Sequence, residues 1–180
     1  SHLVVALQSI VARNVDPAET AVVTVGLLQS GEACNIISAQ AKVVGTVRSF
    51  NSTVHNLLVE RIRALAESIC AGFGATCTVE VPGQVPATVN SEAGAQLMQA
   101  VAEAVVGPAQ VAQITPMMVG EDMAEFLERA PGCYVLVGAS DPNEPMHSPH
   151  HNPTFDFDER TLPVGVALMT GAALSYFEAA

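Results

Sequence analysis

The spacing of apolar residues over the first 81 positions constrains the fold more than any other feature of this chain. Apolar residues recur at helical spacing over 1–13 and 54–72, whereas 21–28, 42–50 and 75–81 show the β-branched, alternating pattern of strands. The order helix, strand, strand, helix, strand predicts a ferredoxin-like βαββαβ arrangement whose first strand is absent. The fold class predicted for this part is therefore α+β.

The second half of the chain shows a different pattern. A Pro- and Gly-containing stretch at 82–86 predicts a boundary between a first domain, 1–83, and a second domain, 84–180. Beyond it, helical and strand-like patterns alternate, which predicts an α/β arrangement. The continuously apolar run at 133–138 indicates a strand covered on both faces of a sheet. The other elements expected here are helices over 92–106, 121–130 and 160–177 and a short strand over 111–115.

Composition excludes several classes of function. The formal net charge of −11 argues against nucleic-acid binding, because phosphates require a basic surface. No apolar run approaches the ~20 residues that span a bilayer. The four cysteines form no C-x-x-C motif, so we expect reduced thiols and a cytoplasmic protein. The chain opens at Ser1, already inside a helical pattern, and we expect it to be a piece of a longer protein.

Histidines cluster in one proline-containing stretch. Three of the five histidines fall within 147–151, and Pro149 and Pro153 exclude a helix there, so the stretch is predicted to be a pinned loop. Imidazoles presented on such a loop are typical of a divalent-metal site, although a solvent-exposed His-rich turn has the same composition. His2 and His55 lie at helical positions and are expected to be structural.

Four short stretches, taken in order, carry a resemblance to a known family. They resemble the M20 family of metallo-amidohydrolases, in the branch that contains aminoacylases, hippurate hydrolases and indole-acetyl-amino-acid hydrolases. The resemblance extends over nearly all 180 residues. It implies a ferredoxin-like lid, or dimerisation, domain followed by the C-terminal portion of an α/β, zinc-peptidase-like catalytic domain. The stretches are RNVDP at 13–17, NII at 35–37 with GTVRSF at 45–50, GEDMA at 120–124, and HNPTFDFDE at 151–159.

The resemblance implies a metal ligand at His151. The last metal ligand of the family is a histidine in the pattern H-x-P-x-[FY] followed by an acidic pair, and Pro153 and Phe155 stand at the matching positions. His147 and His150 are the alternates, more simply interpreted as neighbours that tune the loop. The implied cofactor is a pair of divalent ions, zinc or manganese.

The resemblance also implies two positioning residues in the lid. Asn35 and Arg48 are 48 − 35 = 13 residues apart and match an Asn and an Arg that position substrate in related enzymes. An amide can donate to a developing oxyanion, and a guanidinium can hold an α-carboxylate through two parallel bonds. The alternative is that Asn35 caps a turn and Arg48 lies on a solvated strand face. Ser38 stands where the family usually has proline, which loosens this loop.

Two acidic pairs are expected to be supporting rather than catalytic. Glu121 and Asp122 open a predicted helix, where they are expected to cap it and to support the site. Asp156 and Asp158 alternate with phenylalanines and are expected to stabilise the histidine loop.

The function implied by the resemblance is hydrolysis of the amide bond of an N-acyl amino acid or a related conjugate. The remaining metal ligands and the catalytic glutamate of the family would precede Ser1, so the chain alone is expected to be inactive. A homodimer formed through the lid is the expected partner, with no nucleic acid and no membrane. The alternatives are an M20 dipeptidase or exopeptidase, and a non-catalytic, self-associating α+β interaction module.

Overall fold

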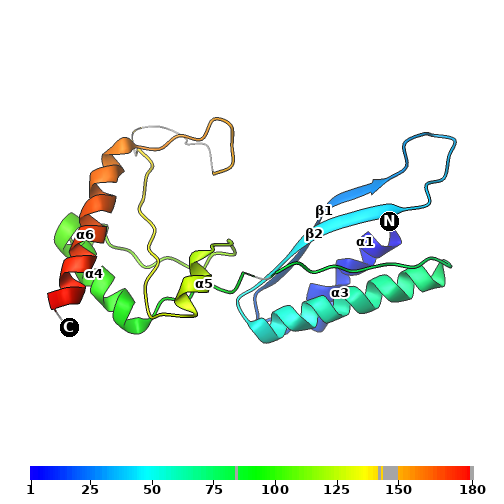
Figure 1. The fold of residues 1–180 in the computed structure, drawn as a ribbon, viewed down its shortest axis with the longest axis horizontal. Helices are drawn as coiled ribbons and strands as arrows, with labels where there is room; N and C mark the ends of the chain where they lie inside the picture. Colours follow the sequence, from blue (N-terminus) through cyan, green and yellow to red (C-terminus); the bar gives the residue numbers. More distant parts are fainter. Residues whose placement is uncertain (84, 142, 144–149, 179–180) are drawn as a thin grey trace. The chain divides into compact units, whose positions relative to one another are not determined.

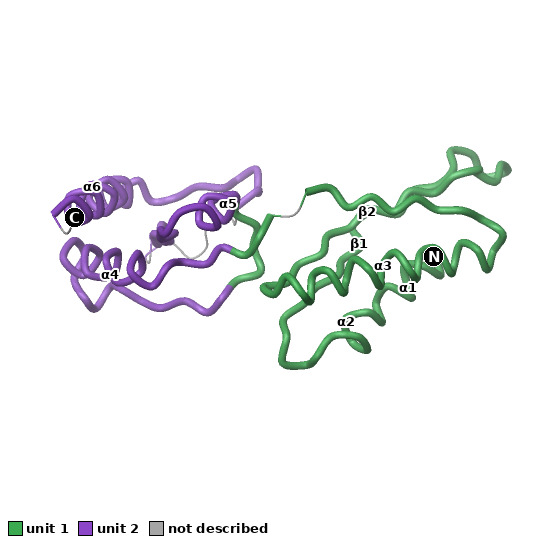
Figure 2. Tube along the Cα trace, turned by 60° about the horizontal axis from the view of Figure 1, so that its bottom comes forward, with its two compact units in different colours: residues 1–87, 117–121 green, residues 88–116, 122–180 purple. Residues whose placement is uncertain are grey.

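The structure, a computed structural model, describes residues 1–83, 85–141, 143 and 150–178. Within these residues the chain is a mixed α+β protein with a two-stranded antiparallel sheet (Figure 1). It forms two compact units, shown in different colours in Figure 2. Gln84, within the predicted domain crossing, lies outside the described residues. Unit 1 comprises Ser1–Ala87 and Met117–Glu121, and unit 2 comprises Thr88–Pro116 and Asp122–Ala180.

A β-hairpin is the framework of unit 1. Strand β1 (Ala21–Ser30) pairs antiparallel with β2 (Ala41–Ser49), so both predicted strands are confirmed. Gly45 in β2 allows the two backbones to approach closely, because a Cβ at this position would lie 2.1 Å from the carbonyl oxygen of Thr24.

Helices cover one face of this hairpin (Figure 1). The predicted N-terminal helix forms as α1 (His2–Leu7) and α2 (Ser9–Asn14). The predicted long helix forms as α3 (Ser52–Gly72), and the Asn51 side chain caps its start by accepting from the Thr53 N–H at 2.9 Å. The buried core between helices and sheet consists of Leu7, Ile10, Val54 and Leu58.

The strand predicted over 75–81 does not form, and this prediction was wrong. The chain turns back after α3 at Gly74 (φ 68°), and the Ala75 N–H donates to the Cys70 carbonyl at 2.8 Å. Arg63 Nη1 then donates to the Val79 carbonyl at 3.0 Å, which holds the extended segment to the helix. A strand requires a ladder partner. Among the described residues β1 and β2 pair only with each other, so 75–81 stays unpaired.

Two helices form the core of unit 2. Helices α4 (Glu92–Val106) and α6 (Leu162–Glu178) form where helices were predicted, and they pack together around Met98, Val101 and Leu168. Gly171 permits the close contact, because a Cβ there would lie 2.8 Å from Cγ1 of Val101. The remaining short helices of this unit are η1 (Pro108–Gln110), α5 (Met123–Leu127) and η2 (Glu159–Thr161).

The strands predicted over 111–115 and 133–138 are also wrong. Both segments are extended but have no ladder partner within the described part of the chain. The second is held by an amide side chain instead, since Tyr134 N donates to Asn90 Oδ1 at 2.7 Å and Asn90 Nδ2 donates to the Tyr134 carbonyl at 2.9 Å. Leu136 is 53% exposed, so the expected burial on two faces is absent as well.

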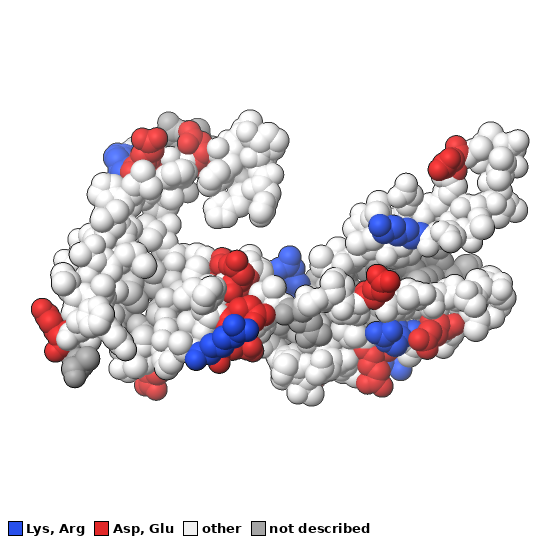
Figure 3. All heavy atoms as spheres, in the orientation of Figure 1, with Lys and Arg blue, Asp and Glu red and all other residues white. Residues whose placement is uncertain are grey.

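The surface is sparsely charged and acidic. In the face drawn in Figure 3, acidic side chains occur on both units beside fewer basic ones, in line with the net charge of −11. All four cysteines are free thiols. Within the described residues, the helices are too short or too polar to cross a membrane.

Candidate functional site

The loop that carries the histidines is tied at its base. The Asp158 N–H donates to the Ala139 carbonyl at 2.9 Å, which joins the two ends of the stretch 139–158. Asp158 then caps η2 by accepting from the Arg160 N–H at 2.9 Å. The base of the loop therefore lies directly before the long helix α6 of unit 2.

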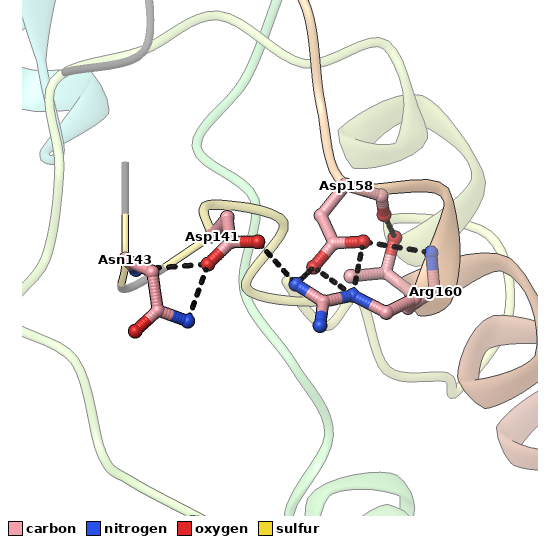
Figure 4. Close-up of polar contacts among 5 residues, drawn as sticks. Asp141, Asn143, Asp158 and Arg160 are labelled. Carbon is pink, nitrogen blue, oxygen red and sulfur yellow. Dashed lines mark hydrogen bonds and ion pairs between the residues drawn. The ribbon is translucent and has the colours of Figure 1, made fainter. Parts of the chain in front are cut away.

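Arg160 bridges two carboxylates at this base (Figure 4). Its Nε lies 2.8 Å from both carboxylate oxygens of Asp158, and its Nη2 lies 2.7 Å from Asp158 Oδ2. The same Nη2 is paired with Oδ2 of Asp141. Asp141 Oδ1 also accepts from the backbone N–H of Asn143 at 2.8 Å and from its side-chain amide at 3.1 Å. We call Asp141, Asp158 and Arg160 the carboxylate clamp.

The clamp perturbs the protonation equilibria of its members. The backbone N–H of Asn143 holds the pKa of Asp141 below its usual value, with a further contribution from the positive charge of Arg160 and an opposing one from partial burial. The pKa of Arg160 is raised, first by its hydrogen bond to Asp158 and then by the charges of both carboxylates. Both shifts favour the charged forms of Asp141 and Arg160.

His151 lies within this loop in an unusual backbone conformation. Its φ is 67°, and it is the sole non-glycine residue with positive φ among those the structure describes. The left-handed conformation is followed by a turn in which Asn152 Oδ1 accepts from the Thr154 N–H at 3.0 Å, and the Asn152 carbonyl accepts from the Phe155 N–H at 2.9 Å. The His150 ring meets the edge of Phe155, with ring centroids 4.9 Å apart. The His151 side chain is exposed.

The donor chemistry of His151 fits one ligand of a metal site, but the described residues do not complete such a site. Protein metal sites generally use three or more side chains. No group of three His, Cys, Asp or Glu side chains placed to hold an ion occurs in the described part of the chain. His147, the first alternate, lies outside the described residues. His2 stacks on Phe73 at 5.2 Å between ring centroids, which agrees with a structural role.

Asn35 lies in the connection between β1 and β2. This connection, residues 31–40, is exposed throughout and is held by local contacts such as Ser38 Oγ to the Gln40 carbonyl at 2.8 Å. The Asn35 side chain makes no hydrogen bond to any described residue, so it is not the cap of a turn here. Its amide is available to a ligand or to another chain.

Arg48 lies near the far end of β2 and is not on a solvated strand face. It is half-buried, and its Nη1 donates to the Met118 carbonyl at 3.0 Å. Gly120 passes close to the same guanidinium nitrogen, which lies 3.9 Å from the position a Cβ would occupy. The stretch Met117–Glu121 thus belongs to unit 1 and helps to fix the direction of the guanidinium.

The structure does not bring Asn35 and Arg48 together. Arg48 pairs with Val22 at the base of the hairpin, whereas Asn35 lies beyond Ala41 at its tip. The 48 − 41 = 7 residues of β2 between Ala41 and Arg48, at about 3.3 Å each, span roughly 23 Å. One chain therefore cannot present both side chains to the same small molecule. Asp122 lies at the start of α5, as expected, but its side chain makes no capping hydrogen bond there.

Sequence patterns missed the Arg160 bridge. Asp141 and Arg160 are 19 positions apart, outside any helical or strand repeat. The available signal was opposite charge at the two ends of a proline-containing loop, with Asp141 before it and Asp158 and Arg160 after it. The expectation that Asp158 stabilises the loop is confirmed.

Comparison with known proteins connects these features to a family. The model of peptidase family M20/M25/M40 matches residues 5–175. N-acetyl-L-cysteine deacetylase of Bacillus subtilis is 35% identical over 162 residues, which are 90% of this chain and 37% of the relative. Thermostable carboxypeptidase 2 of Saccharolobus solfataricus is 32% identical over 161 residues, which are 89% of this chain and 40% of the relative.

A solved structure gives the same result. The YxeP protein of Bacillus subtilis, described as a dinuclear metal-binding peptidase of the M20 family, superposes with a TM-score of 0.74 at 28% identity. The match covers 98% of this chain and 44% of that protein. The chain spans less than half the length of these relatives. With most of its length matched by the family model, this chain belongs to peptidase family M20/M25/M40.

Proposed function

We propose that the protein containing this chain is a metal-dependent hydrolase that cleaves the amide bond of N-acyl amino acids or related conjugates. Its family membership supports this class of reaction, and the relatives compared above include a deacetylase that acts on an N-acetyl amino acid. The solved relative described as a dinuclear metal-binding peptidase supports the use of divalent ions, of which zinc and manganese are our candidates.

The observation that carries the proposal is the conformation of His151. A left-handed backbone costs a residue with a Cβ about 1–2 kcal/mol, and glycine or asparagine would occupy the position with less strain. Strain retained at a loop position is characteristic of functional sites. Here it places an exposed imidazole directly before a rigid Asn152 turn. We therefore assign His151 as one metal ligand of the intact protein, ahead of His147 and His150.

The bound metal would polarise the scissile carbonyl and lower the pKa of water. The residues of this chain would bind and orient the substrate. Arg48, already fixed on one side by the Met118 carbonyl, would hold the α-carboxylate with its remaining N–H groups. Asn35 would donate to the oxygen that gains charge during the reaction.

The separation of Asn35 and Arg48 leads us to propose a homodimer formed through unit 1. Because one chain cannot direct both groups at one small substrate, each chain of a dimer would contribute them to different active sites. Unit 1 would then be a ferredoxin-like lid. In this proposal the lid is 1–83, and 84–180 is the C-terminal portion of the α/β catalytic domain.

We expect the 180-residue chain alone to be inactive, because it spans less than half the length of the relatives it matches. Its free thiols are compatible with the reducing cytoplasm, where we place the protein.

A second candidate function is exopeptidase activity, favoured by the similarity to a carboxypeptidase. An α-carboxylate held by Arg48 would serve either reaction. A non-catalytic interaction module is the third possibility, and it predicts no hydrolysis at all.

One experiment separates these functions. The full-length protein is purified, stripped with a chelator and reloaded with Zn²⁺, Mn²⁺ or Co²⁺, and hydrolysis of a panel of N-acyl amino acids and dipeptides is measured. We expect metal-restored cleavage of N-acyl amino acids, and loss of metal and turnover in His151→Gly. Preference for dipeptides would favour the exopeptidase. No hydrolysis of either class, or full metal binding by His151→Gly, would contradict the proposal.

A further inference from the structure

We propose that Arg160 is a positioning residue for His151, acting by closing the base of the loop that carries it. This inference rests on the proposed role of His151 as a metal ligand. Arg160 does not itself touch the metal or the substrate. Its guanidinium joins Asp141, near the start of the loop, to Asp158 at the end, and thereby limits where the loop can place the imidazole (Figure 4).

The geometry of the clamp requires a guanidinium. Arg160 engages Asp158 through Nε and Nη2 while Nη2 also reaches Asp141. A planar fork can make these bonds in fixed directions, whereas a lysine ammonium is a single point charge on a flexible stem. The bridge adds to the backbone hydrogen bond from Asp158 to Ala139, so the loop ends are joined both through side chains and through the main chain.

A continuous set of contacts leads from the clamp to His151. Phe157, directly before Asp158, stacks with Phe155 at 6.3 Å between ring centroids. Phe155 in turn meets the His150 ring at 4.9 Å and donates its N–H to the Asn152 carbonyl at 2.9 Å. His151 lies between His150 and Asn152 in the sequence, so movement of Asp158 would be transmitted to it through these ring and backbone contacts.

Burial distinguishes the clamp from an ordinary surface ion pair. The side chains of Asp158 and Asp141 are 16% and 25% exposed, although Arg160 is 69% exposed. The pair Arg129–Glu125 in the same unit has its atoms 4.0 Å apart, with side chains 82% and 45% exposed. Exposed pairs of that kind contribute little and are screened by salt. Arg129 therefore offers a matched control with the same change of charge.

The test measures Co²⁺ binding to the full-length protein by titration of the visible absorption of the ion. We expect Arg160→Gln to weaken Co²⁺ binding about 10-fold, in the range found when groups that orient a ligand are removed. Arg160→Lys should recover only part of this loss, and Arg129→Gln should bind Co²⁺ like the parent protein. The thermal unfolding midpoint of each variant is measured in parallel, because a purely structural role would lower the midpoint without changing the absorption spectrum of bound Co²⁺.

A double-mutant cycle links the effect to the clamp. Asp141→Asn should weaken Co²⁺ binding in the same direction, and the double variant with Arg160→Gln should lose little more than either single variant. Amide hydrogen exchange supplies a readout that needs no metal, since protection of the Asp158 N–H should fall in Arg160→Gln and not in Arg129→Gln.

The outcomes separate this inference from the proposed function. If His151→Gly abolishes Co²⁺ binding while Arg160→Gln changes neither Co²⁺ affinity nor exchange of the Asp158 N–H, the positioning role is refuted and the ligand role stands. If His151→Gly binds Co²⁺ like the parent protein, the ligand role fails and the positioning role fails with it. Equal losses in Arg160→Gln and Arg129→Gln would also refute the inference, because the effect would then be one of net charge.

Discussion

Units 1 and 2 are held together in different ways. In unit 1 a sheet and three helices enclose an apolar core in which Ile10 and Leu58 are fully buried. In unit 2 the core is a contact between two helices whose central residues keep 7–8% of their surface exposed. Much of the rest of unit 2 is tied by polar groups, among them the Asn90 amide and the carboxylate clamp.

Because of this difference, Arg48 and His151 are positioned by different kinds of interaction. Arg48 stands on a hairpin that is stabilised by apolar burial, which is insensitive to salt and to moderate changes of pH. His151 stands on a loop positioned by hydrogen bonds and charges, which respond to both. The positions of Arg48 and His151 should therefore be disturbed under different conditions.

The largest expected effect is on the core of unit 1. Leu58→Ala removes a fully buried side chain and should lower the free energy of unfolding by about 2–5 kcal/mol. Met98→Ala in unit 2 should cost less, near the lower end of that range, because its surroundings are more open. Urea denaturation of the two variants measures both values. Equal losses would show that the two cores are equally well packed and would remove the contrast.

The hairpin gives a second test of unit 1. Gly45→Ala places a methyl group against the Thr24 carbonyl oxygen, and it should destabilise the protein by about 1–3 kcal/mol. Gly26→Ala is the matched control, because no atom lies within 4 Å of the Cβ it would add. Thermal unfolding compares the two variants. Similar midpoints would mean that the strands separate at Gly45 without cost.

The His151 loop should show a smaller effect on stability and a large effect on function. His151→Gly relieves the left-handed strain but gives the unfolded chain more freedom, so the free energy of unfolding should change by less than about 1 kcal/mol. Bound metal in the full-length protein should nevertheless be lost, as measured by elemental analysis. A severe loss of stability in this variant would instead assign the imidazole a structural role.

The smallest expected effect concerns protonation of the clamp. The pKa of Asp141 is lower in the folded protein than in the unfolded chain, so its ionised form stabilises the loop at every pH above the ordinary value of about 4. This contribution is lost as the pH falls below that value, through the folded pKa. Carboxyl ¹³C NMR of Asp141 should give a higher midpoint in Arg160→Gln than in the parent protein. Identical midpoints would show that Arg160 does not act on Asp141.

Local sequence signals predicted the elements that depend on local interactions. Helices α3 and α4 begin directly after the capping residues Asn51 and Ser91. A capping side chain and the apolar stripe of its helix lie within a few positions of each other, so local sequence is enough to predict such a helix. The segments 75–81 and 133–138 carry strand patterns but remain unpaired among the described residues, because a ladder depends on a partner that the pattern cannot supply.

The candidate site was predictable to a similar degree. The motif around His151 marked this residue as a candidate ligand, but it did not predict the left-handed backbone or the Arg160 bridge, which joins positions far apart in sequence. For Asn35 and Arg48 the family resemblance implied that both residues position substrate. The hairpin register places them at opposite ends, and only the register could have shown this.

The hydrogen bond between the Asp158 N–H and the Ala139 carbonyl closes a loop whose two ends lie next to each other. The entropic cost of closing such a loop grows only with the logarithm of its length. Residues inserted between its ends would therefore add little to this cost, and they would leave the contact between α4 and α6 in place. The segment could thus be lengthened, or made to carry a reporter group, while α4 and α6 stay packed.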